Sequence, residues 1–404
     1  MRQPLTHSKR KHRHNVVSTT VRKQNSSDPF GLFALLWLDL FLEILYRLPV
    51  KSLLVLKCVS KSLNSLISDP KFVKHHLHLS QTRPYHLLIR NSELLLVDSR
   101  LPSVTAIIPD TTHNFRLNPS DNHPIMIDSC DGIICFENRN DNHVDLVVWN
   151  PCTGKFKILP PLENIPNGKT HTLYSIGYDR FVDNYKVVAF SCHRQINKSY
   201  KYCNSQVRVH TLGTNFWRRI PNFPSNIMGL PNGYVGKFVS GTINWAIENQ
   251  KNYDSWVILS LDLGNESYQE ISRPDFGLDD PVHIFTLGVS KDCLCVLVYT
   301  ETLLGIWVMK DYGNKNSWTK LFAVPYAKVG YHGFGFVDLH YISEEDDQVF
   351  LHFCSKVYVY NYKNSTVKTL DIQGQPSILY NSSRVYFESL YDSSGVYVES
   401  LISP

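Results

Sequence analysis

The sequence predicts a multidomain chain, with a small N-terminal helical bundle followed by an all-β propeller of about six blades. Two observations support this prediction. Residues Leu36 to Leu79 carry apolar side chains at helical spacing in short segments. From about Tyr85 onward the apolar residues alternate, and strand–turn–strand units recur about every fifty residues. A chain of 404 residues that is 43% hydrophobic can bury a large core.

The N-terminal segment differs in charge from the rest of the chain. Residues 1–27 contain seven basic residues and no acidic one, while the whole chain has a net charge of +5, so the remainder is near neutral at about −2. A near-neutral body argues against a nucleic-acid-binding domain. We expect residues 1–29 to form a disordered basic tail. Lys9 to His14 has three open interpretations: a nuclear localisation signal, part of an organelle transit peptide, or a solvated tail without a role.

The first predicted helix is about thirteen residues long and has two apolar stripes. One stripe comprises Leu36, Leu40, Ile44 and Leu48, and the second comprises Leu38, Leu42 and Leu45. Pro49 ends this helix, because proline lacks an N–H and disfavours helical geometry in the residue before it. One stripe can pack on the following helices. The second either docks on the rest of the chain or forms a surface for another protein's helix.

Three more helices are predicted before residue 80. The second runs from Val50 to Val59, and Ser60 is a suitable N-cap for the third. Asp69 followed by Pro70 is a cap followed by a first-turn proline, which predicts the fourth. Together they define a helical domain over residues 30–80. The second helix carries Val50, Leu53, Leu54 and Leu56, and the fourth holds Phe72, Val73 and Leu77. In the third helix, Leu63, Leu66 and Ile67 are expected to face inward.

The second part of the chain is predicted to be β-structure over residues 85–404. Strand-like runs, each bounded by Gly, Asn, Asp or Pro, are Leu94 to Asp98, Val144 to Trp149, Tyr185 to Phe190, Gln206 to Leu212, Trp256 to Leu263, Cys293 to Thr300 and Lys356 to Tyr362.

A longer repeat is superimposed on these strands. Five units consist of a strand, a turn and a second strand, with the turns at Gly154, Gly213, Gly264, Gly313 and Asn364, spaced by 59, 51, 49 and 51 residues. About fifty residues is the period of a four-stranded propeller blade, whereas a sandwich or two barrels would not predict such a recurrence. A weaker unit lies between Tyr85 and Ile127. Strands around Ser377 to Leu379 and Arg384 to Leu390 are expected to close the ring.

Large aromatic residues lie beside four of the repeated turns. They are Trp149, Trp217, Tyr268 and Trp318. We expect them to occupy equivalent places and to pack between neighbouring sheets.

The segment from Arg47 to Leu77 resembles the F-box of plant F-box proteins. The matching motifs are Leu48-Pro49-Val50-Lys51-Ser52-Leu53, Lys57-Cys58-Val59-Ser60-Lys61 and Asp69-Pro70-Lys71-Phe72. Two positions depart from the family pattern, because Trp37 stands where the family has proline and Leu63 where it has tryptophan. In that family the helices bind the small adaptor subunit of cullin–RING ubiquitin ligases.

Most of residues 85–375 resembles the F-box-associated, kelch-like propeller domain of the same family. The matching motifs, in family order, are Ser129-Cys130-Asp131-Gly132-Ile133-Ile134-Cys135, Val148-Trp149-Asn150-Pro151-Cys152-Thr153-Gly154-Lys155, Gly177-Tyr178-Asp179 with Asn184-Tyr185-Lys186-Val187-Val188, and Gly241-Thr242-Ile243-Asn244-Trp245. These motifs are mostly structural, for example an Asp that holds a turn.

The resemblance implies a substrate-recognition subunit of an SCF-type cullin–RING ubiquitin ligase, located in the cytoplasm, the nucleus or both. Its partners would be a Skp-type adaptor subunit, through it a cullin, and a target protein on the propeller, with no nucleic acid and no membrane. A propeller scaffold that is not assembled into a ligase and a propeller enzyme remain as alternatives. The adaptor-binding residues implied are Leu36, Leu38, Leu40, Ile44, Leu48, Pro49, Val50, Leu53, Leu54, Val59 and Leu66.

The sequence contains no motif for catalysis or cofactor binding. GxSxG, P-loop and GxGxxG patterns are absent, and the nine cysteines include no CxxC pair, so reduced thiols and no metal or cofactor are expected. We expect His75, His76 and His78 to be exposed on their helix. Glu344 to Asp347 is interpreted as a solvated loop.

Overall fold

The structure is a computed structural model, and its chain divides into two compact units between Tyr46 and Arg47. No helix in the described part of the chain is long and apolar enough to cross a membrane. The residues that the structure describes are 29–80, 85–90, 93–98, 104–108, 125–140, 143–162, 169–194, 203–223, 232–248, 256–277, 284–300, 302–325, 338–343, 347–353, 356–370 and 394–404.

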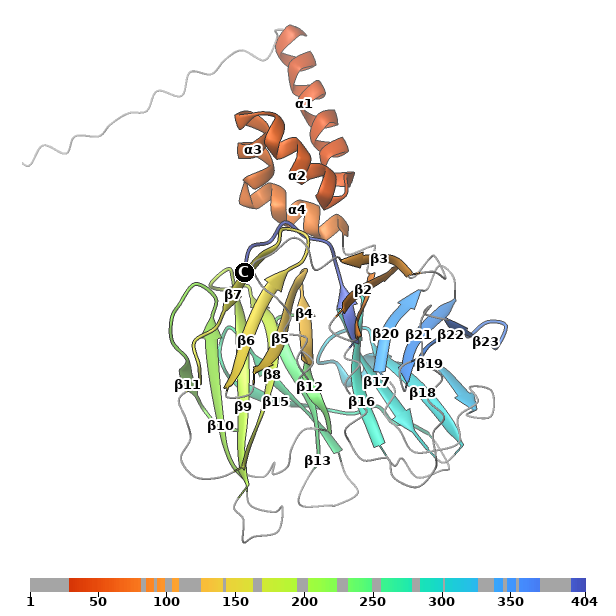
Figure 1. The fold of residues 1–404 in the computed structure, drawn as a ribbon. Helices are drawn as coiled ribbons and strands as arrows, with labels where there is room; N and C mark the ends of the chain where they lie inside the picture. The colour runs from red at the N-terminus through yellow and green to blue at the C-terminus, as the bar shows by residue number, and fades with distance from the viewer. Residues whose placement is uncertain are drawn as a thin grey trace, which may run out of the picture. The chain divides into compact units, whose positions relative to one another are not determined.

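The four predicted N-terminal helices are confirmed (Figure 1). They are α1 (Pro29–Arg47), α2 (Val50–Val59), α3 (Lys61–Ser68) and α4 (Pro70–Ser80). Helix α1 begins seven residues before the predicted start at Leu36 and has 19 residues. Its additional turns continue the apolar run of the sequence toward Pro29, which is well tolerated as the first residue of a helix.

Local capping groups set the helix boundaries, as the sequence predicts. Ser60 Oγ accepts a hydrogen bond from the Leu63 N–H at 3.1 Å at the start of α3. Asp69 Oδ1 accepts from the Lys71 N–H at 2.8 Å at the start of α4. Each bond satisfies one of the N–H groups that the first turn of a helix leaves without a partner.

The described strands form six four-stranded antiparallel sheets, as expected for about six blades. Blade 1 comprises β4 (Ile125–Cys130), β5 (Ile133–Asn140), β6 (His143–Asn150) and β7 (Lys155–Ile158). Blade 2 comprises β8 (Lys169–Asp179), β9 (Asn184–Arg194), β10 (Cys203–Thr211) and β11 (Arg218–Ile220). Blade 3 comprises β12 (Asn232–Val239), β13 (Thr242–Glu248), β14 (Trp256–Asp262) and β15 (Tyr268–Ile271).

The remaining blades follow the same plan. Blade 4 comprises β16 (Ile284–Ser290), β17 (Cys293–Tyr299), β18 (Leu303–Met309) and β19 (Trp318–Pro325). Blade 5 comprises β20 (Asp338–Ser343), β21 (Gln348–Phe353), β22 (Lys356–Asn361) and β23 (Thr366–Leu370). Blade 6 comprises β24 (Ser394–Tyr397), β1 (Tyr85–Arg90), β2 (Glu93–Asp98) and β3 (Val104–Ile108). All seven predicted strand-like runs lie in strands of these blades, with small differences at their ends.

The first strands of the blades follow one another around a closed ring. Strand β4 contacts β8, and the contacts continue through β12, β16, β20 and β24 back to β4. The ring is closed by β24, which pairs antiparallel with β1 from the other end of the propeller sequence. The strands that we expected to close it, around Ser377 to Leu379 and Arg384 to Leu390, lie outside the described residues.

Apolar side chains fill the spaces between adjacent blades. One cluster joins blades 2 and 3, where the Phe190 and Phe223 rings stack at 4.5 Å and Trp245 lies 5.4 Å from Phe223. Similar clusters join blade 1 to blade 2, blade 3 to blade 4 and blade 4 to blade 5. The alternation in the sequence therefore corresponds to strands that bury side chains against the next blade.

Candidate protein-binding surface

Helix α1 presents a stripe of large apolar side chains to solvent. Trp37 is 71% exposed, and Leu40 and Ile44 are each 59% exposed. Leu38 and Phe41 are also exposed. Spacings of three, four and seven residues place Trp37, Leu40, Phe41 and Ile44 on neighbouring positions of one helical face. A contiguous exposed apolar face of this kind is typical of a protein-interaction surface.

Helix α2 carries a second, smaller exposed apolar pair. Val55 is 62% exposed and Val59, one turn further along the helix, is 67% exposed. The Cys58 thiol is also exposed between them in sequence. Val59 belongs to the predicted adaptor-binding set, whereas sequence reasoning did not assign Phe41 or Val55 to it. The signal for Val55 was present, because it precedes Val59 by four residues.

The structure separates the predicted adaptor-binding residues into exposed and interior ones. Val50 and Leu53 are completely buried, so they support the helices and present no surface to a partner. Leu36 lies in α1, but its side chain is outside the described ones. The exposed members are Leu38, Leu40, Ile44, Pro49 and Val59, and the half-buried members are Leu48, Leu54 and Leu66.

His76 corrects one of the sequence-based expectations, since it is buried rather than exposed. Its side chain is 2% exposed, and its Nε2 lies 2.9 Å from the Leu48 carbonyl. A neutral imidazole can donate to that carbonyl, and burial lowers the pKa of His76 in favour of the neutral form. The contact fixes α4 to the segment that precedes α2. His75 and His78 are exposed, as expected.

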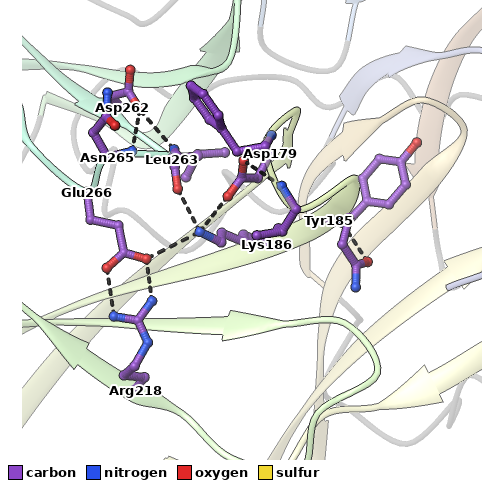
Figure 2. A network of polar contacts seen from close by, with 12 residues as sticks. Asp179, Tyr185, Lys186, Arg218, Asp262, Leu263, Asn265 and Glu266 are labelled. Atoms are coloured by element: carbon purple, nitrogen blue, oxygen red, sulfur yellow. Dashed lines mark hydrogen bonds and ion pairs between the residues drawn. The ribbon is translucent and has the colours of Figure 1, made fainter. Parts of the chain in front are cut away.

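The propeller contains a buried charge network between blades 2 and 3 (Figure 2). Lys186 Nζ on β9 lies 2.6 Å from Asp179 Oδ2 at the end of β8, and both side chains are almost fully buried. The same ammonium donates to the Leu263 carbonyl at 2.6 Å and to Glu266 Oε1 at 3.2 Å. One lysine therefore connects two strands of its own blade to the β14–β15 turn of the next.

Glu266 extends this network back to blade 2. Arg218 on β11 donates to both carboxylate oxygens of Glu266, with Nη1 2.7 Å from Oε2. Hydrogen bonds from Arg218 lower the pKa of Glu266, which keeps its carboxylate charged. Asp179 holds the β8–β9 turn as well, because its Oδ1 accepts from the Phe181 N–H at 2.8 Å. The expected turn-holding role of this Asp is confirmed.

Aromatic residues at the start of the fourth strands connect consecutive blades. Trp217 Nε1 donates to the Pro160 carbonyl at 2.7 Å, and Trp318 Nε1 donates to the Ser272 carbonyl at 2.8 Å. Tyr268 makes the corresponding bond through its hydroxyl to the Pro221 carbonyl at 2.8 Å. In each pair the acceptor follows the fourth strand of the preceding blade. The expected inter-blade anchors are therefore present at three of the four positions.

Trp149 does not occupy the equivalent place, so our alignment of this blade was wrong. It lies near the end of the third strand, β6, before the repeated turn instead of after it. Its ring meets Phe136 edge-on at 6.4 Å, and it pairs across the sheet with Phe156. The tryptophan therefore packs within blade 1 and forms no anchor to another blade of the kind seen at Trp217.

No metal-binding cluster is found in the described ranges. Groups of three or more His, Cys, Asp or Glu side chains that could hold a metal ion are not found there. Cys130, Cys135 and Cys295 are buried free thiols, and burial raises the pKa of each. These thiols therefore stay protonated and pack as small apolar groups. Glu344 and the two residues after it lie outside the described residues.

Two family matches cover nearly all of the described chain. Residues 38–75 match the F-box domain, and residues 86–403 match the F-box associated beta propeller domain. The chain is 28% identical over 364 residues to F-box protein CPR1 of Arabidopsis thaliana, which covers 84% of this chain and 85% of that protein. It is 30% identical over 305 residues to an F-box/kelch-repeat protein of Arabidopsis thaliana, over 71% of this chain and 79% of that protein.

These matches agree with the fold in extent and in order. The F-box match lies on α1–α4, and the propeller match begins in β1 and ends in the segment after β24. The chain therefore belongs to the plant F-box proteins that carry an F-box-associated β-propeller domain.

Proposed function

We propose that this chain is the substrate-recognition subunit of an SCF-type cullin–RING ubiquitin ligase. Its F-box helices bind a Skp-type adaptor, which links the chain to a cullin, and its propeller holds a target protein. The observation that carries the proposal is the exposed apolar stripe of α1, with Trp37, Leu40 and Ile44 each more than half exposed. An F-box is the part of such proteins that binds the adaptor, and this stripe has the character of a binding surface.

The energetics of the stripe fit a stable complex. Burying one large apolar side chain completely contributes roughly 1.5–3 kcal/mol, and interfaces draw most of their affinity from a few such residues. Trp37, Leu40, Phe41 and Ile44 offer four large side chains on one face. The Val55 and Val59 pair on α2 is a separate exposed apolar pair. Their burial by a partner would remove an apolar surface that otherwise stays in water.

In this role the chain acts by proximity and contributes no nucleophile. Holding a target lysine near a ubiquitin thioester carried by other subunits raises the effective concentration of the reacting groups. The propeller suits this task because its blades are fastened to each other by buried polar and aromatic contacts, such as that of Lys186 with Leu263. A rigid propeller holds its target with little loss of conformational entropy.

Adaptor binding can be measured by calorimetry with the full chain and a purified plant Skp-type adaptor. We expect a complex with micromolar or tighter affinity and a loss of at least tenfold in affinity for Ile44→Glu, because a charge then replaces an apolar contact. The matched control is Ile158→Glu on β7, where an isoleucine is 47% exposed on the propeller. This variant should bind the adaptor like the wild type.

The alternative is a propeller scaffold that does not assemble into a ligase. Leu63 favours it to some degree, because this half-buried leucine replaces the tryptophan of the family pattern. Absence of a complex with several plant adaptors, for a chain with a normal thermal transition, would select the scaffold. Affinity purification followed by mass spectrometry would identify target proteins bound to the propeller under either alternative.

A further inference from the structure

The C-terminal residues Val398–Pro404, here called the C-terminal strap, continue from blade 6 onto blade 1. Asn150, which is completely buried, donates through Nδ2 to the Ser400 carbonyl at 3.0 Å and to the Ile402 carbonyl at 2.8 Å. Lys155 Nζ on β7 donates to Ser403 Oγ at 2.8 Å. In Figure 1 the C-terminus accordingly lies beside β7. The strap is therefore held on blade 1 by side chains more than 240 positions away in sequence.

Blade 1 is shaped to accept the strap at Gly132. A Cβ atom at this glycine would lie 2.4 Å from the Val398 carbonyl oxygen and 2.4 Å from Ser400 Oγ. Such distances are far below van der Waals contact, so any side chain here would displace the strap. Gly132 also has φ +81°, a backbone conformation that glycine adopts readily.

The strap also contacts the F-box. The Val50 N–H at the start of α2 donates to the Glu399 carboxylate, while the residue before α2, Pro49, makes no side-chain cap. Glu399 thus takes the place of an N-cap side chain, and a carboxylate also suits the positive end of a helix. Glu399 is half-buried, and this burial raises the pKa of its carboxyl group.

A second contact joins the F-box to blade 2. Lys74 Nζ on α4 lies 2.5 Å and 2.7 Å from the two carboxylate oxygens of Asp183, which follows β8. The Tyr178 hydroxyl donates to the same carboxylate. Both charged side chains are about half exposed, so this ion pair is weak on its own. The pair matters because of where it lies: it attaches α4 to blade 2, whereas the strap connects α2 to blade 1.

We propose that the C-terminal strap and the Lys74–Asp183 pair together lock α2–α4 on the propeller in one orientation. Two contacts on different helices prevent the rotation that a single contact would permit, and the His76–Leu48 bond makes α2 and α4 move together. This inference rests on the proposed function for its consequence: the lock holds the adaptor-binding face of α2 at a fixed position relative to a target on the propeller, which sustains the proximity effect.

Hydrogen exchange of the full chain, measured by mass spectrometry without adaptor or target, tests the lock. Glu399→Ala should raise the exchange rate of the first α2 amides about fivefold, the loss expected from removing a helix cap. Glu399→Gln keeps an acceptor and should leave these rates near those of the wild type. Lys74→Glu should raise exchange in α4, whereas the matched control Lys71→Glu, on the same helix and exposed, should not.

Small-angle scattering of the Glu399→Ala/Lys74→Glu chain gives the second readout, and we expect a broader distribution of interatomic distances than for Lys71→Glu. The lock is overturned if the Glu399→Ala and Lys74→Glu changes leave both the hydrogen exchange of α2 and α4 and the scattering equal to those of the Lys71→Glu control. Lys74→Glu changes only a surface residue, so its result is available even where Glu399→Ala lowers the yield of folded chain. Because adaptor binding is not measured here, loss of the proposed function and loss of the lock are separate results.

Discussion

Lys186 and Asp179 form an ion pair with a 2.6 Å separation inside the propeller, and neither side chain is more than 5% exposed. The pair lies at the junction of blades 2 and 3, because Lys186 also donates to the Leu263 carbonyl. Charges at such depth are tolerated when each is paired with an opposite charge. This junction therefore makes the stability of one blade depend on the position of the next.

Replacing Lys186 by methionine should strongly destabilise the propeller. The substitution leaves the buried Asp179 carboxylate without its cation, and breaking a buried pair by removing one partner costs roughly 3–5 kcal/mol. Urea denaturation of the full chain, followed by tryptophan fluorescence, measures the loss. The control is Arg219→Met, because Arg219 is an exposed cation of the same blade and should change the free energy of unfolding by less than about 0.5 kcal/mol.

The double variant Asp179→Asn/Lys186→Met separates a true pair from two independent residues. Removing both charges eliminates the uncompensated carboxylate, so the double variant should be more stable than the sum of the single losses predicts. Strict additivity of the two losses in unfolding free energy would show that Lys186 and Asp179 do not interact. The contribution of this junction to stability would then come from the bonds of Glu266 alone.

Local signals in the sequence predicted the starts of α3 and α4 and most hairpins, for physical reasons, whereas the start of α1 was placed seven residues too late. The Ser60 and Asp69 caps act on amides two or three residues away, so a short pattern contains the whole interaction. The repeated turns likewise depend on neighbouring residues. Asn150, Asp262 and Asn361 each end a third strand and accept from the N–H two residues later. Such interactions can be inferred without knowing the tertiary fold.

Interactions between distant segments could not be predicted in the same way. Asn150 holds a turn through Oδ1 and binds Ser400 through Nδ2, and only the first of these roles leaves a local pattern. Trp149 and Trp217 both lie near a repeated turn, but only Trp217 bonds to the preceding blade. His76 carries the same helical spacing as an exposed residue. Its burial depends on the Leu48 carbonyl 28 positions away.

Gly132→Ala should destabilise the chain more than Gly213→Ala, which provides a closely matched control. Both glycines have positive φ, +81° and +90°, so alanine introduces a similar backbone strain of roughly 1–2 kcal/mol at each. At Gly213 the new methyl group meets nothing within 4 Å, whereas at Gly132 it would overlap the C-terminal strap. Urea denaturation midpoints measure the difference. Equal losses for the two variants would show that the strap is not packed on Gly132.

The inter-blade anchors predict a difference between two tryptophans. Trp217→Phe removes the indole N–H that bonds to the Pro160 carbonyl and should cost about 1 kcal/mol beyond any packing change. Trp149→Phe preserves an aromatic ring beside Phe136 and removes no inter-blade bond, so its effect on the melting temperature should be smaller. A larger drop in melting temperature for Trp149→Phe than for Trp217→Phe in calorimetric melts would contradict this assignment. It would indicate that Trp149 anchors neighbouring blades as Trp217 does.

Two buried histidines predict loss of stability in mild acid. Burial lowers the pKa of His76 and His210 in the folded chain, so the unfolded chain binds protons first as the pH falls below about 6.5. Stability is then fully present above that pH and is lost progressively as the pH falls through the window toward the lowered folded values. Denaturation free energies between pH 7 and pH 5 measure the slope.

The variant His76→Gln/His210→Gln should flatten this pH slope, because neither glutamine titrates. Glu399 acts with the opposite sign, since its raised pKa favours the folded state as the pH falls toward the acidic end. Both chains should therefore carry Glu399→Gln. An unchanged slope in the double histidine variant would assign the acid sensitivity to other groups.

A pair of Tyr→Phe substitutions tests whether the buried polar contacts between blades differ in energy according to their burial. The Tyr312 hydroxyl donates to Asn244 Oδ1 at 2.6 Å and lies 2.7 Å from Ser260 Oγ, and both partners are completely buried. Removing that hydroxyl takes away the hydrogen bond to the buried Asn244 Oδ1 and Ser260 Oγ, and leaving buried polar atoms unsatisfied costs about 1–3 kcal/mol. Among the residues that the structure describes, the Tyr268 hydroxyl donates to the Pro221 carbonyl alone, in a more exposed place. Tyr312→Phe should therefore lower the unfolding midpoint in urea clearly more than Tyr268→Phe. Equal shifts would mean that water reaches Asn244, and that the junction of blades 3 and 4 is less tightly closed than its contacts indicate.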